Sequence, residues 1–168
     1  EVEKEAGNSA FKRGSLLAQH TAGKQCLTDA CVHYTKALEI IDKLGVKGPA
    51  VLDMRTALFL NLAMVSLKFK SFDTALNCCD EALKMNPSSA KALFRRALAH
   101  QGMGELDKAQ QGLQAAAEAA PKDKVIRKKL EELNKTLAAK SKALAAKKQQ
   151  ATEDKRVRVA KGGETRDY

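Results

Sequence analysis

The sequence repeats itself over 34 residues, first as TALFLNLAMVSLKFKSFDTALNCCDEALKMNPSS (residues 56–89) and then as AKALFRRALAHQGMGELDKAQQGLQAAAEAAPKD (residues 90–123). Alanine returns at equivalent positions, as in Ala63 and Ala97, and Pro87 is matched by Pro121. Proline cannot continue a helix, so it marks the end of each segment. The pattern predicts two helix–turn–helix units whose small residues let antiparallel helices approach closely.

This periodicity resembles the tetratricopeptide repeat, in which small residues stand at the eighth, twentieth and twenty-seventh positions and proline at the thirty-second. The composition agrees, because 44% of residues are hydrophobic but only 4% are aromatic, a mixture typical of helical packing and unfavourable for sheets. We therefore expect an all-α fold of three such repeats in a right-handed superhelical solenoid, followed by a long C-terminal capping helix.

The first repeat is recognisable but longer than the other two. Gly7, Ala30 and Ala37 take its three small-residue positions, which leaves 11 inserted residues between Gly7 and Ala30. Another 11 residues, at about 45–55, separate the first repeat from the second. Both insertions, around 16–27 and 45–55, are predicted to be loops or extensions at helix ends. The repeats then cover about residues 1–44, 56–89 and 90–123.

Beyond the third repeat, an apolar stripe predicts a capping helix over residues 124–151. Its members are Ile126, Leu130, Leu133, Leu137 and Leu144. Residues 152–168 are polar and charged, and we expect them to form a flexible basic tail. The net charge of +10 is concentrated here, because residues 124–161 carry 13 Lys/Arg against 4 Asp/Glu, whereas residues 1–123 carry 16 against 14.

The sequence predicts a cytoplasmic protein that does not associate with membranes. No stretch approaches about 18 uninterrupted apolar residues, and no secretory signal is present. Cys78 and Cys79 are adjacent on a predicted helix, so they do not face one partner, which argues against a disulfide framework. Because the chain starts at Glu1 within a helical pattern, we expect a fragment whose upstream part is missing.

Five polar residues fall on the first helices of the three repeats, which line the concave side of such a stack. Lys4 and Asn8 are four apart, Asn61 is in the second repeat, and Lys91 and Arg95 are again four apart. Cationic side chains bind carboxylates through charge-assisted bonds, and carboxamides add donors without repulsion. The set therefore suits a ligand with two nearby carboxylates, such as a peptide ending in Asp.

The pattern Lys4-x-x-Gly7-Asn8, Asn61-x-Ala63 and Lys91-x-x-x-Arg95 resembles the dicarboxylate clamp of chaperone-binding tetratricopeptide domains. The resemblance implies binding of the EEVD terminus of Hsp90, or of Hsp70, by these five polar residues, with Lys68 assisting.

The stretches around Pro87-Ser88-Ser89 and Asn61-Leu62-Ala63 resemble large immunophilins, either cyclophilins of the forty-kilodalton type or FKBP-type members. That resemblance places a prolyl-isomerase domain upstream, so the parent protein would be a peptidyl-prolyl cis-trans isomerase although this chain is not an enzyme.

Alternative interpretations remain open at this point. Lys91 and Arg95, taken alone, are better explained as solvated cations on an exposed helix face, and only the matching positions of Lys4, Asn8 and Asn61 favour a clamp. Arg96 is expected to point elsewhere. Phe11 and the other four phenylalanines are predicted to be packing residues. The basic C-terminal helix permits calmodulin binding and, less well, nucleic-acid binding, which lacks aromatic platforms; we expect no nucleic-acid partner. No catalytic residue, metal site or cofactor is predicted, and the chain is expected to be a monomer or weak dimer.

Overall fold

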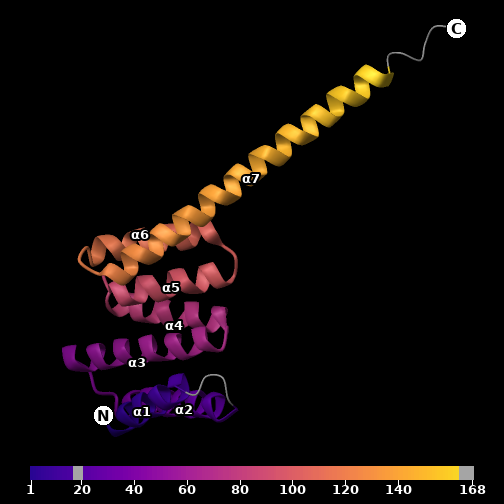
Figure 1. The fold of residues 1–168 in the computed structure, drawn as a ribbon. Helices are drawn as coiled ribbons and strands as arrows, with labels where there is room; N and C mark the ends of the chain where they lie inside the picture. Colours follow the sequence, from indigo (N-terminus) through magenta and orange to yellow (C-terminus); the bar gives the residue numbers. More distant parts are fainter. Residues whose placement is uncertain (17–20, 163–168) are drawn as a thin grey trace, which may run out of the picture. The chain divides into compact units, whose positions relative to one another are not determined.

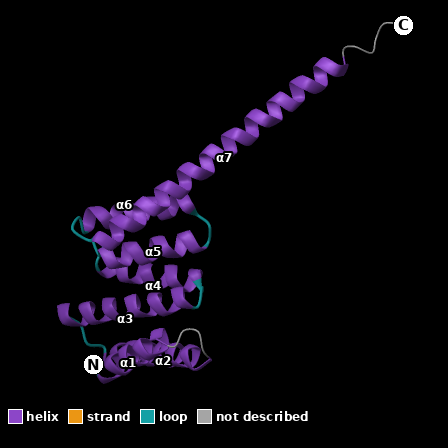
Figure 2. Ribbon diagram, in the orientation of Figure 1, coloured by secondary structure: helices purple, strands orange, loops and turns teal. Residues whose placement is uncertain are grey.

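The computed structural model describes residues 1–16 and 21–162, and within those residues it contains α-helices and no strands (Figure 2). The helices, in chain order, are α1 (Val2–Leu16), α2 (Thr21–Leu44), α3 (Pro49–Lys68), α4 (Phe72–Met85), α5 (Ala90–Gly102), α6 (Leu106–Ala119) and α7 (Lys124–Gly162). The predicted all-α class is confirmed.

The chain divides into two units, Glu1–Lys129 and Leu130–Tyr168. In the first unit the helices pair as α1 with α2, α3 with α4 and α5 with α6, and the pairs stack in chain order (Figure 1). This is the predicted arrangement of three helix–turn–helix repeats. The described part of the second unit is the remainder of α7.

The small residues of the repeat pattern allow the helices of each pair to approach closely. All of those predicted at the twentieth and twenty-seventh positions are buried: Ala30, Ala37, Ala75, Ala82, Ala109 and Ala116. Larger side chains fill the space between pairs, and Leu58, Leu62 and Val65 of α3 form one cluster with Leu27 and Tyr34 of α2. Burial of these apolar side chains is the main stabilising contribution to the stack.

The turn inside each of the last two repeats uses the same backbone conformation. Lys70 has φ 58° and Gly104 has φ 83°, and the two residues are equivalent in the 34-residue register. The left-handed region carries no penalty for glycine but a steric cost for lysine. The repeat therefore imposes its turn geometry even where the residue does not favour it.

Both insertions contribute residues to longer helices, which agrees with one of the two predicted outcomes. α1 continues to Leu16 and α2 begins at Thr21, while residues 17–20 lie outside the described part of the chain. At the second insertion the predicted helix start is wrong, because α3 begins at Pro49 rather than at residue 56. Proline is favourable at the first helical position, where no N–H is needed, and so α3 starts there.

The C-terminal helix is longer than predicted. α7 continues to Gly162 rather than ending near residue 151, so residues 152–162 are helical and not a flexible tail. The cause is a run of Ala, Lys, Gln and Glu, which are strong helix formers, without Pro or Gly before Gly162. Residues 163–168 of the predicted tail lie outside the described residues. At its start, Ile126 is buried with Leu93 and Ala116, whereas Leu144 is 57% exposed.

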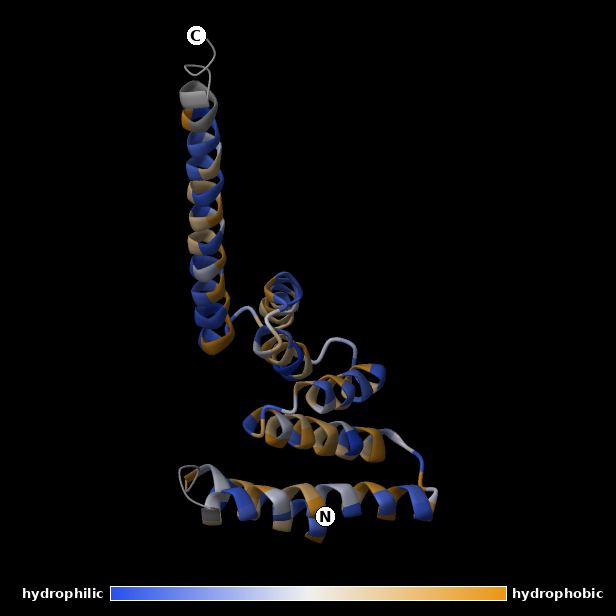
Figure 3. Ribbon diagram, turned by 90° about the vertical axis from the view of Figure 1, so that its right-hand side faces the viewer, coloured by the Kyte–Doolittle hydropathy of each residue, from blue (hydrophilic) through white to orange (hydrophobic). Residues whose placement is uncertain are grey.

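One described helix, α3, is long and apolar enough to cross a membrane by length and composition alone. Figure 3 shows it as mainly hydrophobic along its length. Its apolar residues Leu58, Leu62 and Val65 are buried in the core between repeats. Packing in the stack therefore accounts for the apolar residues of α3 that face the core.

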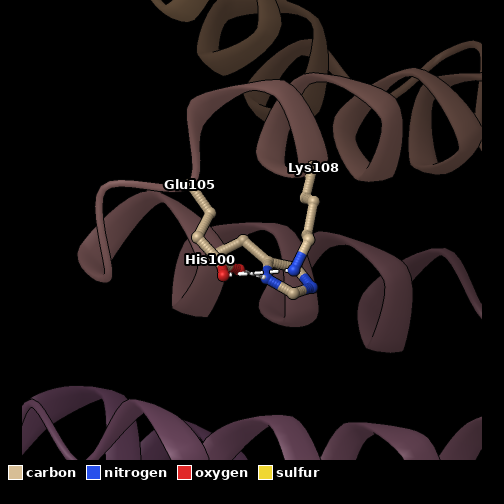
Figure 4. A network of polar contacts seen from close by, with 3 residues as sticks. All are labelled: His100, Glu105 and Lys108. Carbon is tan, nitrogen blue, oxygen red and sulfur yellow. Dashed lines mark hydrogen bonds and ion pairs between the residues drawn. The ribbon is translucent and has the colours of Figure 1, made fainter.

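A network of polar contacts joins the two helices of the third repeat across their turn (Figure 4). The Nδ1 atom of His100 lies 2.6 Å from Oε2 of Glu105, and Nζ of Lys108 donates to Oε1 of Glu105 at 3.1 Å. The hydrogen bond with His100, followed by that with Lys108, holds the pKa of Glu105 below its ordinary value of 4.5. In the first repeat, the hydrogen bonds with His33 and then Lys36 lower the pKa of Glu3 in the same way.

Acidification is expected to reduce the stability that the Glu105 carboxylate contributes through its contacts with His100 and Lys108. A carboxyl group with a lowered folded-state pKa stabilises the fold fully above its unfolded value, near 4.5, and loses that contribution as the pH falls through the folded value. The difference in unfolding midpoint between the wild type and Glu105→Gln should therefore be larger at about pH 6 than at about pH 3. Glu118→Gln, at an exposed glutamate of α6, the helix that Glu105 precedes, serves as the control. A difference that does not shrink in acid contradicts the prediction.

Candidate functional site

A cavity of about 190 Å³ lies between the first helices of the three repeats. Its lining comes from four helices of the first unit and consists of Asn8, Phe11, Tyr34, Asn61, Met64 and Arg95. Three of these residues, Asn8, Asn61 and Arg95, are candidate site residues from the sequence. The stacking of repeats thus brings together polar groups that are up to 87 residues apart in the chain.

The Asn8 carboxamide is oriented by two donors from other helices. The hydroxyl of Tyr34 donates to Oδ1 of Asn8 at 2.8 Å, and Nδ2 of Asn61 donates to the same oxygen at 2.9 Å. A carboxamide oxygen has two lone pairs, and both are used here. The amide nitrogen of Asn8 is then the part of the group that can donate to a ligand.

Arg95 supplies the positive charge of the cavity. Its guanidinium donates to the backbone carbonyl of Leu60, and burial lowers the pKa of Arg95, with Cys79 and Tyr34 acting in the opposite direction. Arginine still remains charged, and it has five N–H donors, of which the carbonyl uses only part. A partly desolvated cation attracts an anion more strongly than an exposed one does.

The three candidate lysines are not among the residues that line this cavity. Lys4 is 25% exposed and pairs with Glu1 at 2.5 Å, while Lys68 and Lys91 are exposed. Lys4 precedes Asn8 by one helical turn, and Lys91 precedes Arg95 by the same interval, so each shares a helix face with its partner. The structure therefore brings Asn8, Asn61 and Arg95 together and does not bring the three lysines into the same cavity lining.

Tyr34 and Met64 were missed by the sequence analysis, and Phe11 was assigned to packing alone. Phe11 packs against the core cluster of the first repeat and also lines the cavity. A signal for Tyr34 does exist in the chain: Gly7 makes room for an aromatic ring, since a Cβ atom on Gly7 would lie 2.5 Å from Cε1 of Tyr34. Arg96 points elsewhere, as expected, and pairs with Asp80 at 3.3 Å.

A larger cavity, of about 500 Å³, lies at the second insertion. Its lining is mainly apolar, and its charged residues are Asp42, Lys47 and Arg55. Asp42 and Arg55 form an ion pair with each other, so this cavity has fewer polar side chains available to bind a ligand than the smaller one. Among the described residues, no group of three or more His, Cys, Asp or Glu side chains is placed to hold a metal ion.

The sequence profile of the tetratricopeptide repeat matches residues 66–133, which include most of the second repeat and all of the third. The chain is a tetratricopeptide-repeat domain. Curated relatives include the mouse peptidyl-prolyl cis-trans isomerase FKBP4, 30% identical over 77% of this chain and 27% of the relative. The Arabidopsis thaliana isomerase FKBP42 is 34% identical over 86% of this chain and 37% of the relative. The chain thus spans about a quarter to about two fifths of the length of these relatives.

Solved tetratricopeptide-repeat domains have a similar fold. The first such domain of Spaghetti (RPAP3), bound to the HSP90 peptide SRMEEVD, is 26% identical with a TM-score of 0.63, covering 82% of this chain and 91% of that one. The second domain of human RPAP3, in complex with the HSP70 peptide SGPTIEEVD, is 26% identical with a TM-score of 0.60, covering 79% and 92%.

Proposed function

We propose that this tetratricopeptide-repeat domain binds the acidic C-terminal EEVD peptide of Hsp90 or Hsp70 and so acts as the docking part of a co-chaperone. The observation that carries the proposal is the convergence of Asn8, Asn61 and Arg95, from three successive repeats, on one cavity. The two solved relatives bound to HSP90 and HSP70 peptides support the same ligand class.

The chemistry of the cavity suits a chain end that bears two carboxylates. The terminal Asp of such a peptide carries its main-chain carboxylate and its side-chain carboxylate. Arg95 offers a charged fork of donors, and Asn8 and Asn61 offer amide N–H groups without further charge. Lys4, Lys91 and Lys68 lie outside the cavity lining, and in this proposal their long flexible side chains pair with the acidic residues of the peptide.

The domain acts as part of a larger protein in this proposal. The FKBP relatives are named as peptidyl-prolyl isomerases and are more than twice as long as this chain, so isomerase activity would lie outside these residues. A chaperone partner of this kind also fits a cytoplasmic location. Calmodulin or nucleic-acid binding by α7 is the alternative hypothesis, which rests on its basic charge alone and is not favoured.

Titration of a pentapeptide ending in EEVD is expected to give micromolar affinity, about −8 kcal/mol, since a short flexible peptide must become ordered when it binds. Its C-terminal amide lacks one carboxylate and should bind much more weakly. Because the contacts are ionic, the affinity should also fall as salt is added. Isothermal titration calorimetry measures all three results. Equal affinity for the acid and the amide would overturn the proposed mechanism.

A further inference from the structure

We propose that Tyr34 is a positioning residue that orients the Asn8 carboxamide and thereby makes the cavity selective for a carboxylate over an uncharged chain end. The inference rests on the proposed function and deepens it. It adds a residue from the second helix of the first repeat, α2, to a site whose other polar residues come from the first helices.

The orientation of Asn8 decides whether the cavity attracts or repels an anion. With Oδ1 turned toward Tyr34 and Asn61, the nitrogen can donate to a ligand. A rotation of the amide by half a turn would present Oδ1 of Asn8 to the ligand instead. This oxygen would then face a carboxylate oxygen of the ligand and repel it. Without the Tyr34 hydroxyl, only the Asn61 contact would remain to select the donating orientation, and Asn61 is itself a carboxamide that can rotate.

Tyr34 is held firmly enough to do this. Its side chain is 1% exposed, and its ring lies directly against the backbone of α1 at Gly7, where an added Cβ would be 2.5 Å from Cε1 and 2.6 Å from Cδ1. Gly7 thus admits the ring, and the next residue, Asn8, accepts its hydrogen bond. The adjacent glycine and asparagine of the sequence pattern have linked roles.

The hydroxyl also keeps its proton. Burial raises the pKa of Tyr34 to about 12, although Arg95 nearby opposes the shift. The residue is therefore a hydrogen-bond donor at every pH at which the peptide would bind. A phenolate in this place would instead accept, and would turn the amide of Asn8 around.

The test compares affinities for a peptide ending in EEVD and for its C-terminal amide, in the wild type, Tyr34→Phe, Asn8→Ala and the double variant. Phenylalanine keeps the ring and removes only the hydroxyl. We expect Tyr34→Phe to weaken binding of the acid peptide about fivefold to tenfold, with a much smaller effect on the amide. In the Asn8→Ala background the same change should have no further effect, because the two residues act through one contact.

Thr28→Val is the matched control, since it removes a hydroxyl from the same helix. Thr28 donates to the backbone carbonyl of Lys24 at 3.1 Å and does not line the cavity, so both affinities should stay within about twofold. Unfolding midpoints of all variants show whether the fold is intact.

The outcomes separate this inference from the function on which it rests. A wild type that does not bind the acid peptide, or binds acid and amide equally, overturns the proposed function and this inference with it. A wild type that discriminates while Tyr34→Phe discriminates equally well overturns the inference alone. Equal weakening of both peptides with a lowered midpoint also overturns it, because it would show a purely structural role.

Discussion

Replacement of Arg95 by alanine is expected to lower the affinity for an acidic C-terminal peptide by about 100-fold. Truncation of one partner of a largely desolvated charged pair typically costs about 2–5 kcal/mol, and Arg95 is the cation that lines the cavity. Calorimetric titration with the acid peptide measures the loss. Arg95→Lys should give an intermediate result, because lysine keeps the charge but not the planar fork of donors.

Arg96→Ala provides the control for this experiment. The two arginines are neighbours on α5, yet Arg96 pairs with Asp80 at 3.3 Å and is not part of the cavity lining. Its removal should change the affinity by less than about twofold. Equal losses in both variants would mean that binding depends on the general charge of α5, and an unchanged affinity in Arg95→Ala would place the site elsewhere. The unfolding midpoint of Arg95→Ala should also be measured, since Arg95 donates to the carbonyl of Leu60.

Gly14→Ala is expected to destabilise the fold by about 2–3 kcal/mol, the largest effect predicted on stability. A Cβ atom at Gly14 would lie 2.8 Å from the carbonyl oxygen of Gly23 and 2.9 Å from the backbone nitrogen of Leu27. Backbone atoms cannot rotate away as a side chain can, so α1 and α2 would have to separate. Denaturant unfolding measures the change in free energy.

The expected sign is opposite to that of helix propensity alone. Alanine is favoured over glycine within a helix by about 1 kcal/mol, so unchanged or increased stability of Gly14→Ala would show that the helices are not in close contact at this point. Ser9→Ala, at an exposed position of α1, is the control and should stay within about 0.5 kcal/mol of the wild type.

The repeat architecture was predictable because its signal is both local and periodic. Ala75 and Ala109, or Ala82 and Ala116, recur at one spacing because each performs the same packing task in successive units, and all four are fully buried. Helix ends without such a repeated task were less predictable. The start of α3 at Pro49 and the extension of α7 to Gly162 depend on local helix propensity, which the repeat register does not report.

The candidate site was predictable only in part, for a similar reason. Asn8, Asn61 and Arg95 occupy corresponding helices, so the stacking of repeats implied that they converge, and they line one cavity. Tyr34 belongs to the other helix of its repeat and reaches the cavity only through the space left by Gly7. That contact depends on the packing of two particular side chains, and no periodic pattern records it.

The cavity draws its lining from every repeat of the array, and this has a mechanical consequence. In a linear stack each unit is supported only by its neighbours, so the outermost pair can open while the others stay folded. Detachment of α1 and α2 would remove Asn8 and Tyr34 and so disassemble the pocket without global denaturation. A ligand that contacts all three repeats binds only when the first helix pair is docked, so its binding would stabilise that pair against local unfolding.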